Sequence, residues 1–360
     1  MLLKNALLNE NITDIEILNK KIVSIGKNDS YTGEIIDLKG LSVYPGLIEI
    51  HAHGCMGYDT MDAKYLSEMS LYQAENGITS WLPTTMTMGF DAVKNVTDED
   101  ISNVEGAEVL GFHLEGPYIS KKYKGAQNEN YIKNPDLEEF KKYNNVRMVT
   151  IAPELEGSEE FIKNCGCRVS LGHTDADYET GVAAFKAGAK CLTHTFNAMP
   201  PFHHRNPSVI GAAIEENAYV QVISDGFHLH KTVVTALYRI FGSDRMVIIS
   251  DCLRPTGVAD GEYEPGGQMV TVKDGKARLS DGTIAGSTTT LLGCVKKAVE
   301  FGIPKEEAFK MASCTPAKLL GLEGRKGEIK VGADADLIAV SDDLTLKLSV
   351  AGGKIYKNTL

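Results

Sequence analysis

Short apolar runs and stretches of helical periodicity alternate between about residue 45 and residue 325. A short apolar run predicts a buried strand, whereas apolar residues three or four positions apart predict one face of a helix. Eight runs predict strands: Leu47–Ile50, Ile78–Leu82, Val109–Leu114, Val146–Ile151, Arg168–Leu171, Cys191–Thr193, Val220–Ile223 and Met246–Ile249. Strands that alternate with helices form parallel sheets, and eight such units over roughly 250 residues are typical of a (β/α)8 TIM barrel, an α/β fold.

Three helices are predicted most clearly, because each helical pattern is followed by a glycine that can end it. They are Lys64–Glu75, Thr180–Ala187 and Lys231–Phe241. In the last of these, Val234, Leu237 and Phe241 fall on one face. A glycine after the last periodic residue is a common helix C-terminus.

The two ends of the chain show another pattern, in which short strands are separated by turns. The predicted strands are Ile15–Leu18, Lys21–Ile25, Ile35–Leu38, Asp336–Val340, Leu344–Val350 and Lys354–Tyr356. Alternating apolar and polar residues predict half-buried strands. We therefore expect residues 1–44 and 326–360 to form one small β-sandwich domain, with the barrel domain, residues 45–325, inserted between them.

Side chains that can bind a metal or take part in catalysis follow or end the predicted barrel strands. They are His51, His53, Glu115, His173, His194, His228 and Asp251. The C-terminal ends of the strands carry the active site in barrels of this kind. Alternate residues of a strand share a face, so His51 and His53 can bind one ion. Imidazoles and carboxylates in this number predict a metal centre that activates water for hydrolysis.

Several of these residues can have more than one role. Asp251 can be a general base beside a metal-bound water or a structural N-cap. His228 can polarise a carbonyl group or lie on a surface loop. His113 shares a strand face with Glu115 and is either a ligand or a residue packed behind the ligands. We expect three further histidines to lie at the surface or behind the site: His203, His204 and His230.

Composition narrows the function classes. The net charge of −11 and the isoelectric point near 5.4 argue against a nucleic-acid or anionic-membrane partner. Seven cysteines without a regular spacing are typical of reduced thiols in a cytoplasmic protein. The first residues lack the apolar core of a signal peptide, and no run reaches the roughly 20 apolar residues of a membrane span.

Six longer motifs resemble known sequences. Residues 45–54, PGLIEIHAHG, resemble the first-strand signature of the amidohydrolase superfamily. Four other motifs resemble the N-acetylglucosamine-6-phosphate deacetylases, a family within this superfamily. They are residues 111–117, 171–174, 193–200 and 224–228. Residues 332–337, GADADL, are similar to the strand by which many members return to their small β-domain. The resemblance covers nearly the whole chain.

The resemblance implies a role for each matching residue. Glu115, His173 and His194 would hold the catalytic metal, and His51 and His53 would complete a second site. The ions, one or two per chain, would be Zn, Fe, Mn or Co. Asp251 would be the general base and acid, and His228 would polarise the acetamide carbonyl. The sugar phosphate would contact Gln127, Asn197, Ala198 and Arg205, the arginine reaching in from a neighbouring subunit of a homodimer.

The implied reaction is hydrolysis of N-acetylglucosamine 6-phosphate to glucosamine 6-phosphate and acetate, in amino-sugar catabolism or cell-wall recycling. Gln127 stands where the family usually has a histidine, so N-acetylgalactosamine 6-phosphate or another N-acyl substrate stays open. No strand-end lysine offers a bridging carbamate, which disfavours dihydroorotase-like and hydantoinase-like chemistry. A catalytically silent binding barrel is disfavoured by the complete set of candidate ligands.

Overall fold

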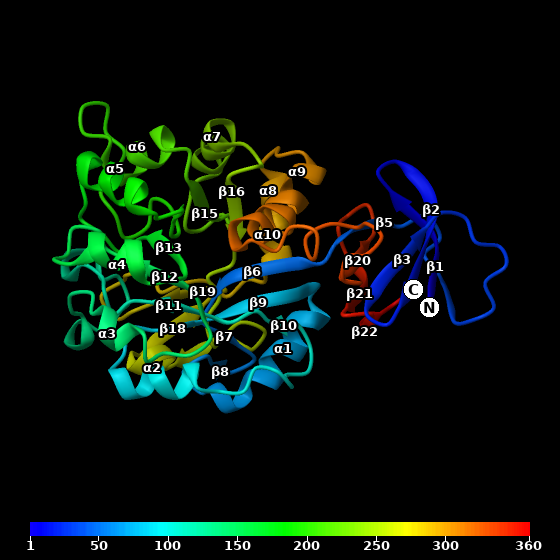
Figure 1. Ribbon diagram of the computed structural model, residues 1–360, viewed down its shortest axis with the longest axis horizontal. Coiled ribbons are helices and arrows are strands. Elements are labelled where there is room, and N and C mark those ends of the chain that lie inside the picture. The colour runs from blue at the N-terminus through cyan, green and yellow to red at the C-terminus, as the bar shows by residue number, and fades with distance from the viewer.

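The computed structural model describes the backbone of residues 1–360 and every side chain except that of Pro265. Two separate sheets organise the chain, one in a large body with helices around it and one in a smaller body that contains both termini (Figure 1). Among the helices that the structure describes, none is long and apolar enough to cross a membrane.

The large body is built on eight parallel strands that follow each other in chain order around a nearly closed barrel. They are β6 (Leu47–Ala52), β9 (Ile78–Thr85), β11 (Phe112–Glu115), β12 (Val146–Ile151), β13 (Arg168–Leu171), β14 (Cys191–Leu192), β15 (Tyr219–Ile223) and β16 (Met246–Ile249). Helices follow most of the strands and cover the outside. The predicted TIM barrel is confirmed, and its closely spaced parallel strands bring all the strand ends to one rim.

The barrel closes between its first and last strands through a buried carboxylate. There the two strands share only a bridge between Ala52 and Cys252. The Glu49 side chain spans this seam: its two oxygens accept the backbone N–H groups of His51 (3.0 Å) and Ser250 (2.9 Å). Burial raises the pKa of Glu49 to about 7. Glu49 therefore replaces ladder hydrogen bonds that the backbone does not make, and it ties together the strands that carry His51 and Asp251.

The predicted third strand, Val109–Leu114, is wrong in its extent. The structure divides it into β10 (Glu108–Val109), which pairs with β9, and the barrel strand β11. The break falls at Gly111, whose φ is +125° and whose backbone passes so close to Asn145 that a Cβ atom would lie 2.6 Å from its carbonyl oxygen. Only glycine tolerates both conditions, so the apolar run could not continue as one strand.

The helices agree well with the predictions where the periodicity is strong. The α-helices are α1 (Leu66–Glu75), α2 (Phe90–Thr97), α3 (Leu137–Phe140), α4 (Ser158–Asn164), α5 (Tyr178–Ala187), α6 (Ser208–Glu215), α7 (Lys231–Phe241), α8 (Leu291–Glu300), α9 (Lys305–Met311) and α10 (Cys314–Leu320). Short 3-10 turns are η1 (Ala63–Tyr65), η2 (Lys121–Tyr123), η3 (Glu129–Tyr131) and η4 (Pro265–Gly267). Helix α7 has its predicted bounds and buries Val234, Leu237 and Phe241. Apolar residues on one helix face thus pack against the strands.

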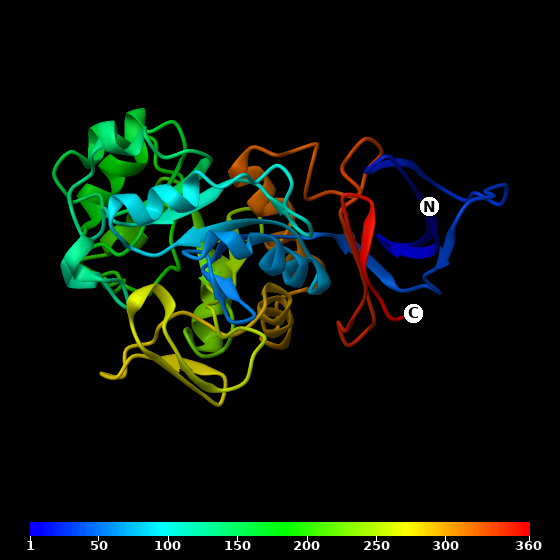
Figure 2. The ribbon, with the colours of Figure 1, turned by 90° about the horizontal axis from the view of Figure 1, so that it is seen from below.

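A small antiparallel sheet, which the sequence patterns did not predict, follows the last barrel strand. Its strands are β17 (Gly261–Tyr263), β18 (Val270–Lys273) and β19 (Lys276–Arg278), and we call residues 261–285 the flap. The flap lies to one side of the barrel (Figure 2, yellow) and buries Val270 and Val272 against Leu253. A two-stranded hairpin, β7 (Gly54–Cys55) and β8 (Tyr58–Asp59), follows β6.

The terminal strands form the second sheet, as predicted. Its strands are β1 (Leu2–Leu8), β2 (Asn11–Leu18), β3 (Lys21–Ile25), β4 (Ile35–Asp37), β5 (Ser42–Pro45), β20 (Leu337–Val340), β21 (Leu346–Ala351) and β22 (Lys354–Asn358). They surround a core of their own that includes Leu3, Ile15, Val43, Leu337 and Leu348. Strand β5 pairs with β20 and so joins the two ends of the chain. The domain boundaries at residues 45 and 326 stay a prediction.

A buried ammonium group connects the two bodies. The Lys326 side chain is 2% exposed and its Nζ contacts Asp336 (2.5 Å), Glu108 (2.8 Å) and Asp334 (3.2 Å). Glu108 belongs to β10 beside the barrel, whereas Asp336 precedes β20 of the terminal sheet. A buried charge is tolerated when it is paired in this way, but removing one partner leaves the others buried and uncompensated.

We expect Lys326→Met to lower the free energy of unfolding by about 3–5 kcal/mol, because it leaves the Asp336 carboxyl buried without its cation. Urea unfolding followed by circular dichroism measures this loss. The matched control is Lys330→Met, since Lys330 is half exposed and pairs only with Glu328. That control should change stability by no more than about 0.5 kcal/mol. Equal effects of the two substitutions would contradict the interpretation.

Candidate metal centre

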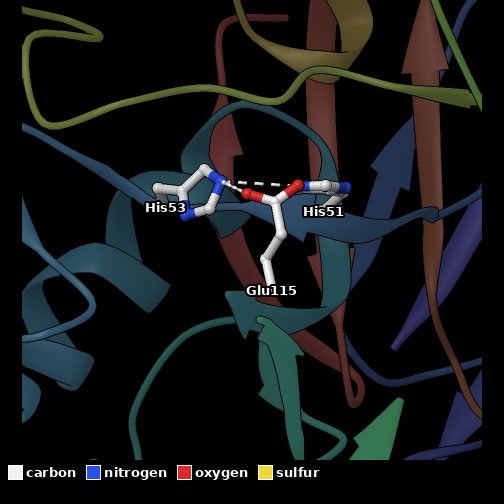
Figure 3. Close-up of side chains that lie close together, drawn as sticks. All are labelled: His51, His53 and Glu115. Atoms are coloured by element: carbon white, nitrogen blue, oxygen red, sulfur yellow. Dashed lines mark hydrogen bonds and ion pairs between the residues drawn. The ribbon is translucent and has the colours of Figure 1, made fainter. Parts of the chain in front are cut away.

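Four histidines and one glutamate meet at the C-terminal rim of the barrel. His51 and His53 lie at the end of β6, Glu115 ends β11, His173 follows β13 and His194 follows β14. None of these residues is more than 5% exposed. The Glu115 carboxylate lies between the rings of His51 and His53 (Figure 3). The structure therefore brings together all five residues that the sequence predicted as ligands.

Local backbone conformation turns three of the site residues toward the barrel axis. His173, His194 and Asp251 have φ values of +46°, +26° and +50°. Residues other than glycine seldom adopt this left-handed region, and such conformations cluster at functional sites. Each of these residues lies two positions after the end of its strand. His51 and His53, in contrast, use the ordinary alternation of an extended strand.

The ligand atoms form two groups that share Glu115. In the first group, His173 Nε2 and His194 Nε2 lie 3.1 Å apart, and they lie 3.3 Å and 3.0 Å from Glu115 Oε1. In the second, His51 Nε2 and His53 Nε2 lie 3.3 Å apart, 3.2 Å from Oε1 and 3.3 Å from Oε2 respectively. A tetrahedral ion with bonds of about 2.0 Å separates its ligand atoms by about 3.3 Å. Each group thus fits one metal ion.

Acceptors behind the rings orient three of the four histidines. Each of these rings directs Nδ1 at an oxygen that can only accept a hydrogen bond, so Nδ1 carries the proton and Nε2 is left with a lone pair for a metal. The pairs are His51 with Gln221 Oε1 (3.0 Å), His53 with Thr84 O (3.2 Å) and His173 with Tyr123 O (2.8 Å). The Nδ1 of His194 has no partner among the described residues.

The close packing of carboxylates and imidazole rings shifts the pKa values of several site residues. Burial alone would raise the pKa of Glu115, but the adjacent His51 and His173 outweigh it and hold this pKa well below its usual range. Burial alone would lower the pKa of His53, but hydrogen bonds to Asp251 and Glu115 raise it to about 10. His194 differs, because burial lowers its pKa. The metal-free site therefore holds a proton on His53 but a neutral His194.

Asp251 lies beside the second group only. Its Oδ1 is 3.3 Å from His53 Nε2 and 3.5 Å from His51 Nε2. Burial opposes ionisation of this carboxyl, but the two rings lower its pKa to about 2. An ionised carboxylate next to the ligand atoms can accept a proton from a water molecule bound there.

A cavity of about 350 Å³ opens above these residues. Five predicted catalytic or substrate residues line it: Gln127, Asn197, Ala198, His228 and Asp251. The Asp225 carboxylate holds His228 through Nδ1 at 2.7 Å and also accepts the backbone N–H groups of Phe227 and His228. Arg205, in contrast, lies on the exposed segment 201–206 and does not line the cavity of its own chain.

His113 packs behind the ligands. Its ring nitrogens face Ile50 O (3.0 Å) and Thr150 Oγ1 (2.8 Å), so neither is free for an ion. Burial holds the pKa of His113 well below its usual range. The ring is therefore a neutral part of the barrel interior. His203 and His204 are exposed, as expected, and His230 caps helix α7.

Sequence reasoning missed the residues that support the ligands. Glu49 and Gln221 lie on barrel strands, and Thr84 and Tyr123 contribute backbone carbonyls. A polar side chain within an apolar run is costly to bury unless it is paired, which was the available signal for Glu49 and Gln221. Backbone carbonyls carry no such signal.

Comparison with known proteins agrees with this geometry. The model of the Amidohydrolase family matches residues 42–356. The N-acetylglucosamine-6-phosphate deacetylase of Bacillus subtilis is 40% identical over 91% of this chain and 87% of its own length. The N-acetylgalactosamine-6-phosphate deacetylase of Escherichia coli O157:H7 is 34% identical over 83% of this chain and 84% of its own. A mutant N-acetyl-D-glucosamine-6-phosphate deacetylase of Mycobacterium smegmatis, solved with N-acetyl-D-glucosamine-6-phosphate, superposes with a TM-score of 0.92 at 29% identity over 99% of both chains.

The two groups should load with metal at different pH. An ion that enters the second group must displace the proton that His53 holds up to a pKa of about 10. The affinity of this group should therefore rise about tenfold per pH unit for each proton released. The first group needs no proton released from His194. Titration of the metal-free chain with Zn²⁺ against a chelator should show one ion near pH 6 and a second as the pH rises to 8. Simultaneous loss of both ions on acidification would contradict this difference.

Proposed function

This chain belongs to the amidohydrolase family, and we propose that it hydrolyses N-acetyl-D-glucosamine 6-phosphate to D-glucosamine 6-phosphate and acetate. The observation that carries the proposal is the pair of ligand groups around Glu115, beside an ionised Asp251 and below a cavity of about 350 Å³. Such an arrangement suits hydrolysis of an amide bond. Relatives named for this reaction are similar to the chain over most of its length.

The metal would be held by the two groups described above, with Glu115 shared between them. Divalent ions bound there supply a Lewis acid and lower the pKa of water. Imidazole and carboxylate ligands suit Zn, Fe, Mn or Co. The first group, Glu115 with His173 and His194, is complete without Asp251, so one ion satisfies it.

Asp251 would transfer a proton from the attacking water to the departing amine. Its low pKa keeps it ionised at neutral pH, so it is ready to take a proton from the attacking water. The same carboxyl then returns the proton to the departing amine, which must be protonated before it leaves. A single carboxylate can perform both steps because acid and base roles alternate along the reaction.

His228 would stabilise the oxygen of the acetamide. Asp225 holds the ring through Nδ1, which leaves Nε2 to face the cavity. Because Nδ1–H is donated to Asp225, Nε2 carries an N–H only when the ring is an imidazolium; in that form it would donate to the carbonyl oxygen as negative charge develops there. A fixed donor in a buried site stabilises that charge more than a donor in water does.

Asn197 and Ala198 line the cavity and are proposed to contact the sugar phosphate. Gln127, the third predicted sugar contact, also lines the cavity, but Thr87 and Glu115 occupy both ends of its amide. Arg205 lies outside it in the same chain, which fits an arginine offered to the site of a neighbouring subunit. A guanidinium group binds phosphate through two parallel hydrogen bonds. We therefore propose a homodimer. We also propose a cytoplasmic location, which the seven free cysteines support.

A second candidate substrate is N-acetylgalactosamine 6-phosphate, because one relative 34% identical to the chain is named for it. The two sugars differ only in the orientation of one hydroxyl group. A site that hydrogen-bonds a hydroxyl discriminates strongly against a substrate that cannot offer it. Values of kcat/KM measured side by side on the two sugars decide between these substrates.

Purified protein should release acetate from N-acetylglucosamine 6-phosphate and contain about one or two divalent ions per chain. Enzymatic assay of acetate and elemental analysis of the same sample provide both numbers. Bound metal without acetate release would support the metal centre but not this substrate, and other N-acyl substrates would then be tested. Absence of both would exclude the proposed function.

Asp251→Asn should lower kcat by about 10²–10⁴-fold, the usual contribution of a general acid and base. At least one ion should stay bound, because the first ligand group does not include Asp251. Steady-state kinetics with metal analysis of the variant test this. Undiminished turnover would remove Asp251 from the reaction.

A further inference from the structure

Gln127 uses both ends of its side-chain amide within the protein. The residue is 3% exposed. Its Oε1 accepts the backbone N–H of Thr87 at 2.7 Å, and its Nε2 donates to Glu115 Oε2 at 2.5 Å. The opposite orientation of the amide would set N–H against N–H and an oxygen against a carboxylate. The chemistry of the two partners therefore fixes which atom faces Glu115.

Glu115 must serve both ligand groups, so the rotation of its carboxylate matters. Oε1 faces His173, His194 and His51, whereas Oε2 faces only His53 among the four rings. The torsion at the end of a glutamate side chain is soft. The Gln127 donor holds Oε2 in place, while a hydrogen bond from Thr87 Oγ1 to Glu115 O (3.0 Å) fixes the backbone.

We propose that Gln127 is a positioning residue that fixes Glu115 as the shared ligand of both metal groups. This rests on the proposed metal-dependent function and goes beyond a role in contacting the sugar. Partners that hydrogen-bond to metal ligands orient them, and their loss commonly costs 10–100-fold in metal affinity or activity. The second group should suffer first, because it depends on Oε2.

The test is Gln127→Met, which keeps the length of the side chain and removes both hydrogen bonds. Its bound metal should fall from about two ions per chain to about one in elemental analysis after reconstitution with Zn²⁺. kcat should fall while KM for the sugar phosphate changes by less than about threefold. The matched control is Gln268→Met, which loses the bond from Gln268 Nε2 to Ala126 O but no contact with Glu115. It should retain both ions.

Unchanged metal content with a raised KM would overturn the proposal and make Gln127 a residue that binds the sugar. A wild-type chain that holds only one ion after reconstitution would also overturn it, since Glu115 would then not be shared. Metal content needs no substrate, so it decides the role of Gln127 even if the substrate assignment fails. Thermal unfolding of the metal-free variant near that of the wild type shows that the fold is retained.

A second inference concerns two thiols that precede β13, whereas the ligand His173 follows this strand. Cys165 and Cys167 flank Gly166 in the turn between α4 and β13, and their Sγ atoms lie 3.9 Å apart. Both side chains are half-buried. Gly166 has a φ of +76°, and a Cβ atom added to it would meet no other segment within 4 Å.

Cys165 differs from the other six cysteines in acidity. The hydrogen bond from Cys167 lowers the pKa of Cys165 to about 7, so much of this thiol is ionised at neutral pH. The pKa of Cys167 is raised, because it donates that hydrogen bond and is buried. Burial raises the pKa of the other five cysteines. The thiolate is the form that attacks disulfides.

We infer that Cys165 and Cys167 form a dithiol site that reacts with low-molecular-weight disulfides. The Cys165 thiolate attacks the disulfide RSSR, forms a mixed disulfide and releases RS⁻. The Cys167 thiol then loses its proton and attacks the Cys165 sulfur, which releases a second RS⁻. Both cysteines are oxidised and RSSR is reduced to two thiols. The sulfur atoms must approach from 3.9 Å to about 2.05 Å.

Glutathione disulfide is the probe, and intact-mass spectrometry with peptide mapping is the readout. The wild-type chain should lose two hydrogens, with the new bond between Cys165 and Cys167, and dithiothreitol should reverse it. Cys167→Ser should stop at a mixed disulfide on Cys165, and Cys165→Ser should not react there. The control Cys314→Ser, which changes the other half-buried cysteine, should behave as the wild type. A stable mixed disulfide on the wild-type chain, or no reaction, would overturn the inference.

Discussion

A single buried carboxylate, that of Glu115, determines how the rest of the site must be built. A carboxylate removed from water is unstable unless cations or hydrogen-bond donors surround it. Four imidazole rings and the Gln127 amide lie within 3.3 Å of its two oxygens. In the absence of a metal, protons on the rings supply the positive charge. A metal ion can replace those protons without rearrangement of the ligands, because their spacing already matches that of a coordination sphere.

The barrel makes this convergence possible, but regular strands are not enough. Parallel strands deliver their C-terminal ends to one rim, and left-handed conformations at His173, His194 and Asp251 then direct these side chains inward. The first and last strands, which lead to His51, His53 and the proposed base Asp251, pair through their backbones only near Ala52 and Cys252. Glu49 bridges them below this point, and the backbone N–H of Asp251 donates to His51 O at 3.0 Å, so both contacts fix the distance between the His51/His53 pair and Asp251.

The parts of the structure that could be predicted are those encoded by local patterns. Helix α7 and the candidate ligands at the strand ends follow from periodicity and from residue type. Gly111 breaks the third strand because of its approach to Asn145, a contact between distant segments that no local pattern records. The flap escaped prediction because its strands are short and bury few side chains. Gln221 and Glu49 act through partners on other strands, so only the three-dimensional structure reveals what they hold.

The segment 121–127 links the metal centre to the wall of the cavity. Tyr123 holds His173 through its carbonyl, Gln127 holds Glu115 through its amide, and Ala126 accepts a hydrogen bond from Gln268 of the flap. The same segment lines the cavity that is proposed to receive the sugar. Changes here that alter which sugar fits would therefore also displace a metal ligand. If the sugar binds there as proposed, substrate preference and the number of bound ions would be coupled through one short loop, because the same backbone supports both.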